Sequence, residues 1–160
     1  MLEIAIWLSE TKWSIALLES LYMYPWIESA HVLSICFFIG ILLFVDLRLM
    51  GVAFTKLPIS EMNKKVLPWS LFGFGLMALT GFLLFYAIPV RSYQNIFFRF
   101  KVILILFAGL NAFLFHRQMK REGMNWDEGK SIPKSMHLKA AASLVIWSGV
   151  IISGRMIAYN

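Results

Sequence analysis

The sequence predicts an all-α membrane protein: a bundle of four transmembrane helices preceded by an N-terminal amphipathic segment at the membrane interface. Hydrophobic residues make up 59% of the 160 residues, and the mean hydropathy is +0.71, both above the values usual for a soluble domain. The apolar stretches are continuous and lack the alternation of membrane-barrel strands, so helices are the expected way to satisfy the backbone inside a bilayer. The length corresponds to a single domain.

The first 25 residues are apolar but interrupted by charge. Glu10 and Lys12 would lie at the middle of any span placed here, which disfavours a fifth transmembrane helix. Trp13 and Leu17 recur at helical spacing, which is typical of one or two helices lying in the plane of the interface. We therefore expect residues 1–25 to form an interfacial segment.

Four longer apolar segments follow, each close to the roughly 20 residues that a transmembrane helix needs. The predicted spans are residues 26–50, 66–88, 96–116 and 133–159. Pro25 is expected to separate the interfacial segment from the transmembrane domain, 26–160. Pro68 is expected in the first turn of the second span, where a missing N–H costs little. Short polar connections are predicted over 91–95 and 117–131.

The distribution of cationic residues predicts the orientation. Ten of the 15 Lys and Arg residues lie in or beside the two long loops, between the first and second spans and between the third and fourth. The rule that cytoplasmic loops are positively charged then places those loops in the cytoplasm and both termini in the periplasm. The net charge of +6 is explained by these loops, so no nucleic-acid partner is expected. The lone Cys36 lies in an apolar run and is interpreted as a small buried hydrophobe.

Ionisable side chains within spans are costly, so each is a candidate for function. Glu28 and His31 lie three residues apart and share a helix face in the outer half of the first span. At similar depth, the third span supplies Arg99 and Lys101, and the fourth supplies Arg155. These side chains predict an outer pocket for an anionic headgroup, haem propionates or a quinone, with His31 as metal ligand or proton carrier. The alternative is an ion-paired network that only fixes helix packing.

The other two histidines lie toward the cytoplasmic side. At ~1.5 Å per residue, His116 is roughly 30 Å below the outer end of its span and His31 roughly 8 Å below the start of its own. The separation of about 20 Å along the bundle excludes one haem iron bound by both. His116 and His137 could meet at the inner surface, although no metal-ligand spacing accompanies them, and interfacial histidines are the favoured interpretation.

Two further polar groups lie within the apolar spans. Asp46 is expected to anchor the inner end of the first span by pairing with Lys64, Lys65 or His137, with a proton relay as the alternative. Asn111 is expected to form a hydrogen bond across helices in the third span.

Six short motifs give the chain a resemblance to an uncharacterised bacterial family of small four-span inner-membrane proteins. They are Glu28-x-x-His31, Asp46-Leu47-Arg48-Leu49-Met50-Gly51, Leu67-Pro68-Trp69, Phe98-Arg99-x-Lys101, Asn111-Ala112-x-x-Phe115-His116 and Gly154-Arg155-Met156-Ile157-Ala158-Tyr159. The resemblance covers the chain after residue 20 and implies a bacterial inner-membrane location. It carries no catalytic or ligand residues, and His137 is outside the pattern.

These observations favour a non-enzymatic membrane protein with a polar outer pocket, acting as a redox accessory that binds haem b or a quinone. No catalytic residues are predicted. A structural or assembly subunit of a larger membrane complex is the alternative, and a small oligomeric transporter or channel is a third. Small residues on the second and fourth spans would permit a homo-oligomer.

Overall fold

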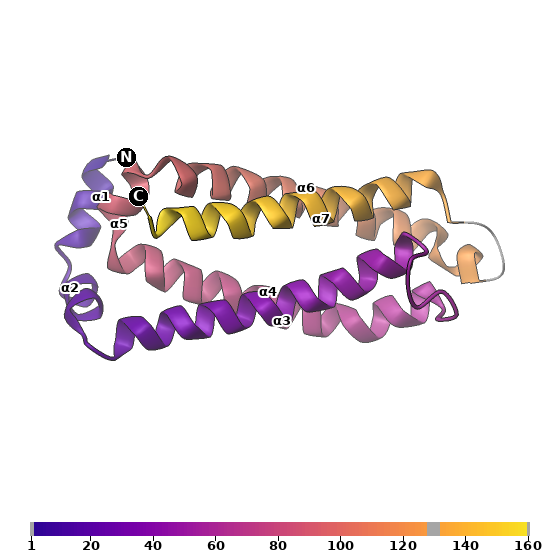
Figure 1. The fold of residues 1–160 in the computed structure, drawn as a ribbon, viewed down its shortest axis with the longest axis horizontal. Helices are drawn as coiled ribbons and strands as arrows, with labels where there is room; N and C mark the ends of the chain where they lie inside the picture. Colours follow the sequence, from indigo (N-terminus) through magenta and orange to yellow (C-terminus); the bar gives the residue numbers. More distant parts are fainter. Residues whose placement is uncertain (1, 128–131, 160) are drawn as a thin grey trace.

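Four long helices dominate the computed structural model, which describes residues 2–127 and 132–159 (Figure 1). They are α3 (Met23–Leu49), α4 (Ile59–Ala87), α6 (Ile96–Asp127) and α7 (Lys134–Ile157). Each contains a segment long and apolar enough to cross a membrane. The predicted all-α, four-helix membrane bundle is thus confirmed.

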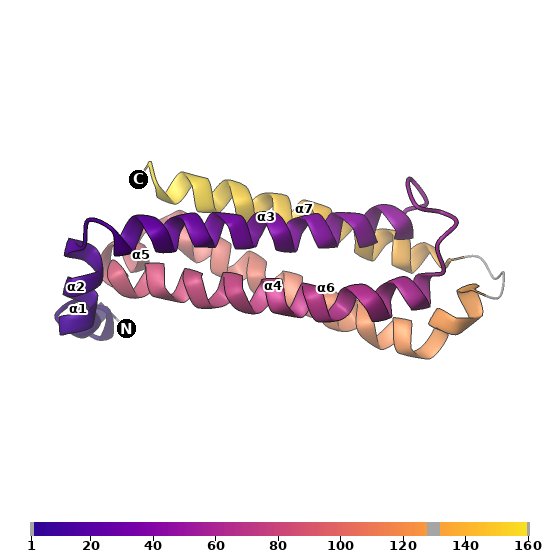
Figure 2. The ribbon, with the colours of Figure 1, turned by 90° about the horizontal axis from the view of Figure 1, so that it is seen from below.

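The long helices form two antiparallel pairs, α3 with α4 and α6 with α7 (Figures 1 and 2). The α3–α4 loop lies at one end of the bundle, which we call the loop end. Both chain termini lie at the opposite end, which we call the terminal end. Contacts of α3 with α7 and of α4 with α6 join the two pairs into one bundle.

Two short helices, α1 (Leu2–Ser9) and α2 (Lys12–Glu19), cover the terminal end (Figure 2). Thr11 caps α2, because its side chain accepts a hydrogen bond from the backbone N–H of Ser14 at 3.4 Å. The Thr11 hydroxyl also lies 2.7 Å from that of Tyr86, and Ser14 donates to the carbonyl oxygen of Tyr86 at 2.8 Å. These bonds fasten the N-terminal segment to the end of α4. Its position relative to a bilayer stays a prediction.

Buried apolar side chains form two clusters inside the bundle. The loop-end cluster consists of Val45, Leu49, Ile59, Met62, Met119, Met136 and Ala140. The middle cluster consists of Phe38, Met77, Ala108, Trp147 and Val150. Buried side chains nearer the terminal end are largely polar, and they include His31, Ser34, Thr80 and Ser153. The interior therefore changes from apolar to polar along the bundle.

The helices extend beyond the predicted spans at several points, because they continue outside the apolar runs. α4 begins at Ile59, so Pro68 lies inside the helix and not in its first turn. α6 continues to Asp127, through much of the predicted polar connection. The predicted turn over 91–95 is largely the short helix α5 (Pro89–Gln94), and Pro25 lies in the first turn of α3. Outside the apolar region, water and polar side chains permit helix to continue, and the predicted spans followed hydropathy alone.

Candidate functional site

His31 lies on α3 toward the terminal end, with a side chain that is 9% exposed. Its Nδ1 is 2.9 Å from Oγ1 of Thr80 on α4. The Thr80 hydroxyl donates its own proton to the carbonyl oxygen of Leu76 at 2.7 Å, so it must accept from His31. Nδ1 therefore carries the proton of the neutral ring, and Nε2 carries the lone pair.

Gly81 of α4 provides the space that the His31 ring occupies. A Cβ at Gly81 would lie 3.0 Å from Cε1 of His31, closer than ordinary van der Waals contact. A side chain at this position would therefore require the His31 ring to shift by a few tenths of an ångström. The backbone of α4 fixes the orientation of the ring together with Thr80.

Leucine at position 81 is expected to destabilise the protein by ~1–3 kcal/mol, because the added side chain must displace the His31 ring. Gly75→Leu is the matched control on the same helix, since nothing lies within 4 Å of a Cβ at that position. That control is expected to gain roughly 0.5–1 kcal/mol from helix propensity. Denaturation midpoints in detergent micelles measure both changes, and equal effects would contradict the packing of His31 against Gly81.

Lys101 brings a cation from α6 to the same level of the bundle. It interacts electrostatically with His31, and its side chain passes over the backbone of α7. A Cβ at Gly154 would lie 3.4 Å from Nζ of Lys101, an ordinary contact, so the ammonium group lies beside the backbone of α7. The site thus involves all four long helices: α3 and α6 contribute the ionisable groups, α4 contributes Thr80 and Gly81, and α7 lies beside the ammonium group.

The remaining side chains predicted for the outer pocket point elsewhere. Arg155 donates from Nη2 to the hydroxyl of Tyr159 at 2.6 Å and lies over its ring at 4.9 Å. Arg99 donates from Nε to the carbonyl oxygen of Tyr93 at 3.1 Å and lies 5.0 Å over that ring. Glu28 is exposed. The structure therefore brings His31 and Lys101 together and leaves the other three at the surface.

The candidates toward the loop end have structural contacts. Asn111 donates to the carbonyl oxygen of Lys139 at 3.0 Å, which confirms the predicted hydrogen bond across helices. Nδ1 of His116 lies 2.9 Å from the carbonyl oxygen of Ala112, one turn back in its own helix. His137 is half-buried. Within the described residues, no group of three or more His, Cys, Asp or Glu side chains is placed to hold a metal ion.

Asp46 is buried beside α7, where its carboxyl group forms a hydrogen bond with Ser143. The predicted pairing with Lys64, Lys65 or His137 was wrong. Lys65 instead pairs with Glu61 at 2.7 Å on its own helix. The sequence pattern alone singles out neither Ser143 nor Thr80.

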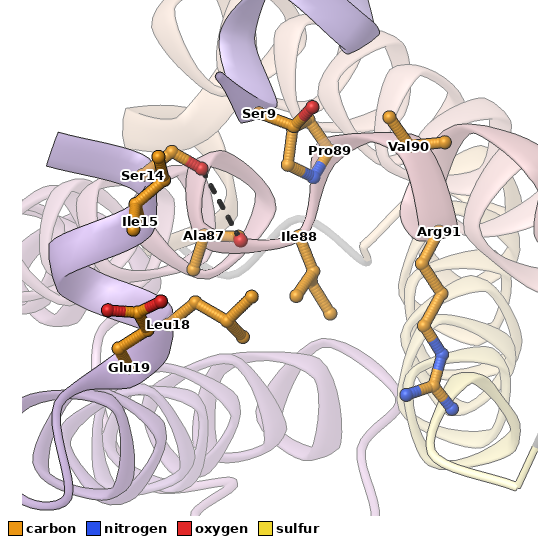
Figure 3. A pocket seen from close by; sticks show the side chains of 10 residues that line it. All are labelled: Ser9, Ser14, Ile15, Leu18, Glu19, Ala87, Ile88, Pro89, Val90 and Arg91. Atoms are coloured by element: carbon orange, nitrogen blue, oxygen red, sulfur yellow. Dashed lines mark hydrogen bonds between the residues drawn. The ribbon is translucent and has the colours of Figure 1, made fainter. Parts of the chain in front are cut away.

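A surface pocket of about 290 Å³ opens at the terminal end, between α2 and the start of α5 (Figure 3). Figure 3 shows Glu19 and Arg91 on opposite sides, with Leu18 and Ile88 between them. Its charges and apolar floor suit the boundary between lipid and water. His31 does not line this pocket, so the pocket and the His31–Lys101 site are separate.

A family model described as a family of unknown function (DUF6644) matches residues 20–160. No curated protein and no solved structure matches the chain. The matched range includes all four long helices with His31 and Lys101, whereas α1 and α2 precede it.

Proposed function

The chain belongs to this family of unknown function (DUF6644). We propose that the protein binds a quinone head group at His31 and Lys101. The protein is a multi-pass membrane protein with four apolar spans, so a lipid-soluble ligand would share its environment. In this proposal the protein is a redox accessory and not an enzyme.

The observation that carries the proposal is the pairing of a proton acceptor with a cation in the bundle interior. Nε2 of His31 carries the lone pair of the neutral ring because Nδ1–H donates a hydrogen bond to Thr80. The Lys101 ammonium has only donors. A quinone carbonyl accepts a hydrogen bond from such a donor, and a quinol hydroxyl donates to such an acceptor. Both redox forms of the ligand can therefore be bound.

Haem b is the second candidate, and part of the site fits it. A histidine that ligates iron through Nε2 usually donates its other ring N–H to a fixed acceptor, as His31 does to Thr80. However, the ring packs against Gly81 and the ammonium packs against Gly154. A macrocycle would have to lie flat against Nε2 among these packed helices, whereas a quinone needs only a carbonyl oxygen there. The packing thus favours the quinone.

The proposed location is the bacterial inner membrane, with the loop end in the cytoplasm and the terminal end in the periplasm. The excess of Lys and Arg beside the long loops supports this orientation. His31 and Lys101 would then lie in the periplasmic half of the bilayer. This depth suits exchange with the quinone pool of the membrane.

Titration of a short-chain ubiquinone into the purified protein in lipid nanodiscs tests the proposal, with tryptophan fluorescence as the readout. Saturable quenching is expected, and His31→Ala should weaken binding at least tenfold, or about 1.4 kcal/mol. His116→Ala is the control and should bind like the wild type, because His116 faces a different region of the bundle.

Two outcomes would overturn the quinone assignment. A Soret band in the purified protein that His31→Ala removes would assign haem instead. If no quinone binds to protein that keeps its helical content, while a membrane complex co-purifies with it, the role of an assembly subunit is favoured.

A further inference from the structure

Asp46 occupies an unusual position for a carboxyl group. It lies on α3 in the loop-end half, directly after Val45 of the loop-end cluster, and it is 6% exposed. One oxygen, Oδ2, is buried and has no hydrogen-bond partner among the described residues. The hydroxyl group of Ser143 on α7 is the hydrogen-bonding neighbour of this carboxyl group. An ionised carboxylate with a single hydrogen bond in an apolar interior is costly.

The cations closest to Asp46 in sequence and on α4 have other partners. Arg48, on the same helix, donates from Nε to the carbonyl oxygen of Leu57 at 2.9 Å. On α4, Lys65 forms its ion pair with Glu61. Neither cation therefore neutralises the buried carboxyl group.

The basic groups on the remaining helices do not pair with Asp46 either. On α7, Lys139 donates to a backbone carbonyl and a glutamine side chain of α6. On α6, His116 directs Nδ1 to the carbonyl one turn back. In the part of the chain that the structure describes, Lys64 and His137 form neither an ion pair nor a hydrogen bond with Asp46. Within residues 2–127 and 132–159, none of these basic groups therefore forms an ion pair with Asp46.

We propose that Asp46 and Ser143 form a proton-binding site inside the loop-end half of the bundle. The bound proton lies on Oδ1 and is donated to Oγ of Ser143. Oδ2 then becomes a neutral, carbonyl-like oxygen, the kind of buried polar atom that proteins leave unpaired at least cost. The site is independent of the proposed quinone site, since it involves other residues and the opposite half of the bundle.

Infrared spectroscopy of the full-length protein in lipid at neutral pH tests this site, through the carbonyl stretch of a protonated carboxylic acid. The wild type is expected to show the band, and Asp46→Asn is expected to lose it. Ser143→Ala should shift its frequency, because the hydrogen bond from the carboxyl proton is removed. Glu61→Gln is the control and should leave the band unchanged, since that carboxylate is exposed and paired with Lys65.

Three outcomes would overturn the proton site. The first is a wild-type spectrum without the band, and the second is a band that persists in Asp46→Asn. The third is a band that sodium chloride abolishes and choline chloride does not, which would assign a sodium site instead. If Asp46→Asn does not fold, the position of the band in Ser143→Ala tests the proposal. An unshifted band in that variant would contradict it. Loss of quinone binding in His31→Ala has no bearing on these spectra.

Discussion

Trp147→Ala is expected to destabilise the bundle by about 3–5 kcal/mol, as truncation of a large buried aromatic side chain does. Trp147 is 8% exposed in the middle cluster, and its ring meets that of Phe38 edge-on at a centroid distance of 4.9 Å. Lipid is as apolar as the bundle interior, so helix association in a membrane depends on close packing rather than on exclusion of water. The cavity left by the indole removes that packing from the centre of the bundle.

Denaturant titration in mixed micelles, followed by far-UV circular dichroism, measures this loss without relying on tryptophan fluorescence. Trp26→Ala is the matched control, because Trp26 lies on α3 and is 73% exposed. The control should change the free energy of unfolding by no more than about 0.5 kcal/mol. Similar losses for the two variants would mean that Trp147 does not hold the helix pairs together.

The number, order and approximate position of the long helices were predictable from hydropathy, because a bilayer admits only a helix over each long apolar run. The helix ends were less predictable. α4 contains Pro68 well inside the helix, and α6 runs on past His116 through polar residues. The energetics that end an apolar run differ from those that end a helix, so hydropathy alone predicted the apolar runs and not the helix ends.

The level of His31 and Lys101 along the bundle was predictable, but the direction of side chains around each helix was not. The number of residues from the span ends predicts that His31 and Lys101 lie at the same level of the bundle, and the two side chains do interact. The same count placed Arg155 with them, yet its long side chain reaches Tyr159 at the end of the bundle. The role of Thr80 was not predictable, because a hydroxyl group within an apolar run indicates a site only when the residue that faces it is known.

Lys101→Met is expected to lower quinone affinity at least tenfold, or about 1.4 kcal/mol, while leaving the free energy of unfolding unchanged or higher. Methionine matches the length of the lysine stem and can occupy the space over Gly154 without a charge. Replacing a buried charge by an apolar side chain of similar volume is often neutral or stabilising. The same titration in nanodiscs gives the affinity, and the denaturation assay gives the stability.

The combination of the two measurements separates a binding site from polar packing. If Lys101 only joins helices, Lys101→Met changes stability and leaves quinone affinity as it was. Lys139→Met serves as the comparison, because Lys139 joins α6 to α7 near the loop end and lies far from His31 along the bundle. That variant should lose stability and keep its affinity, the reverse of the result expected for Lys101→Met. If Lys101 does not stabilise the fold but is required for quinone binding, its role is to bind the ligand.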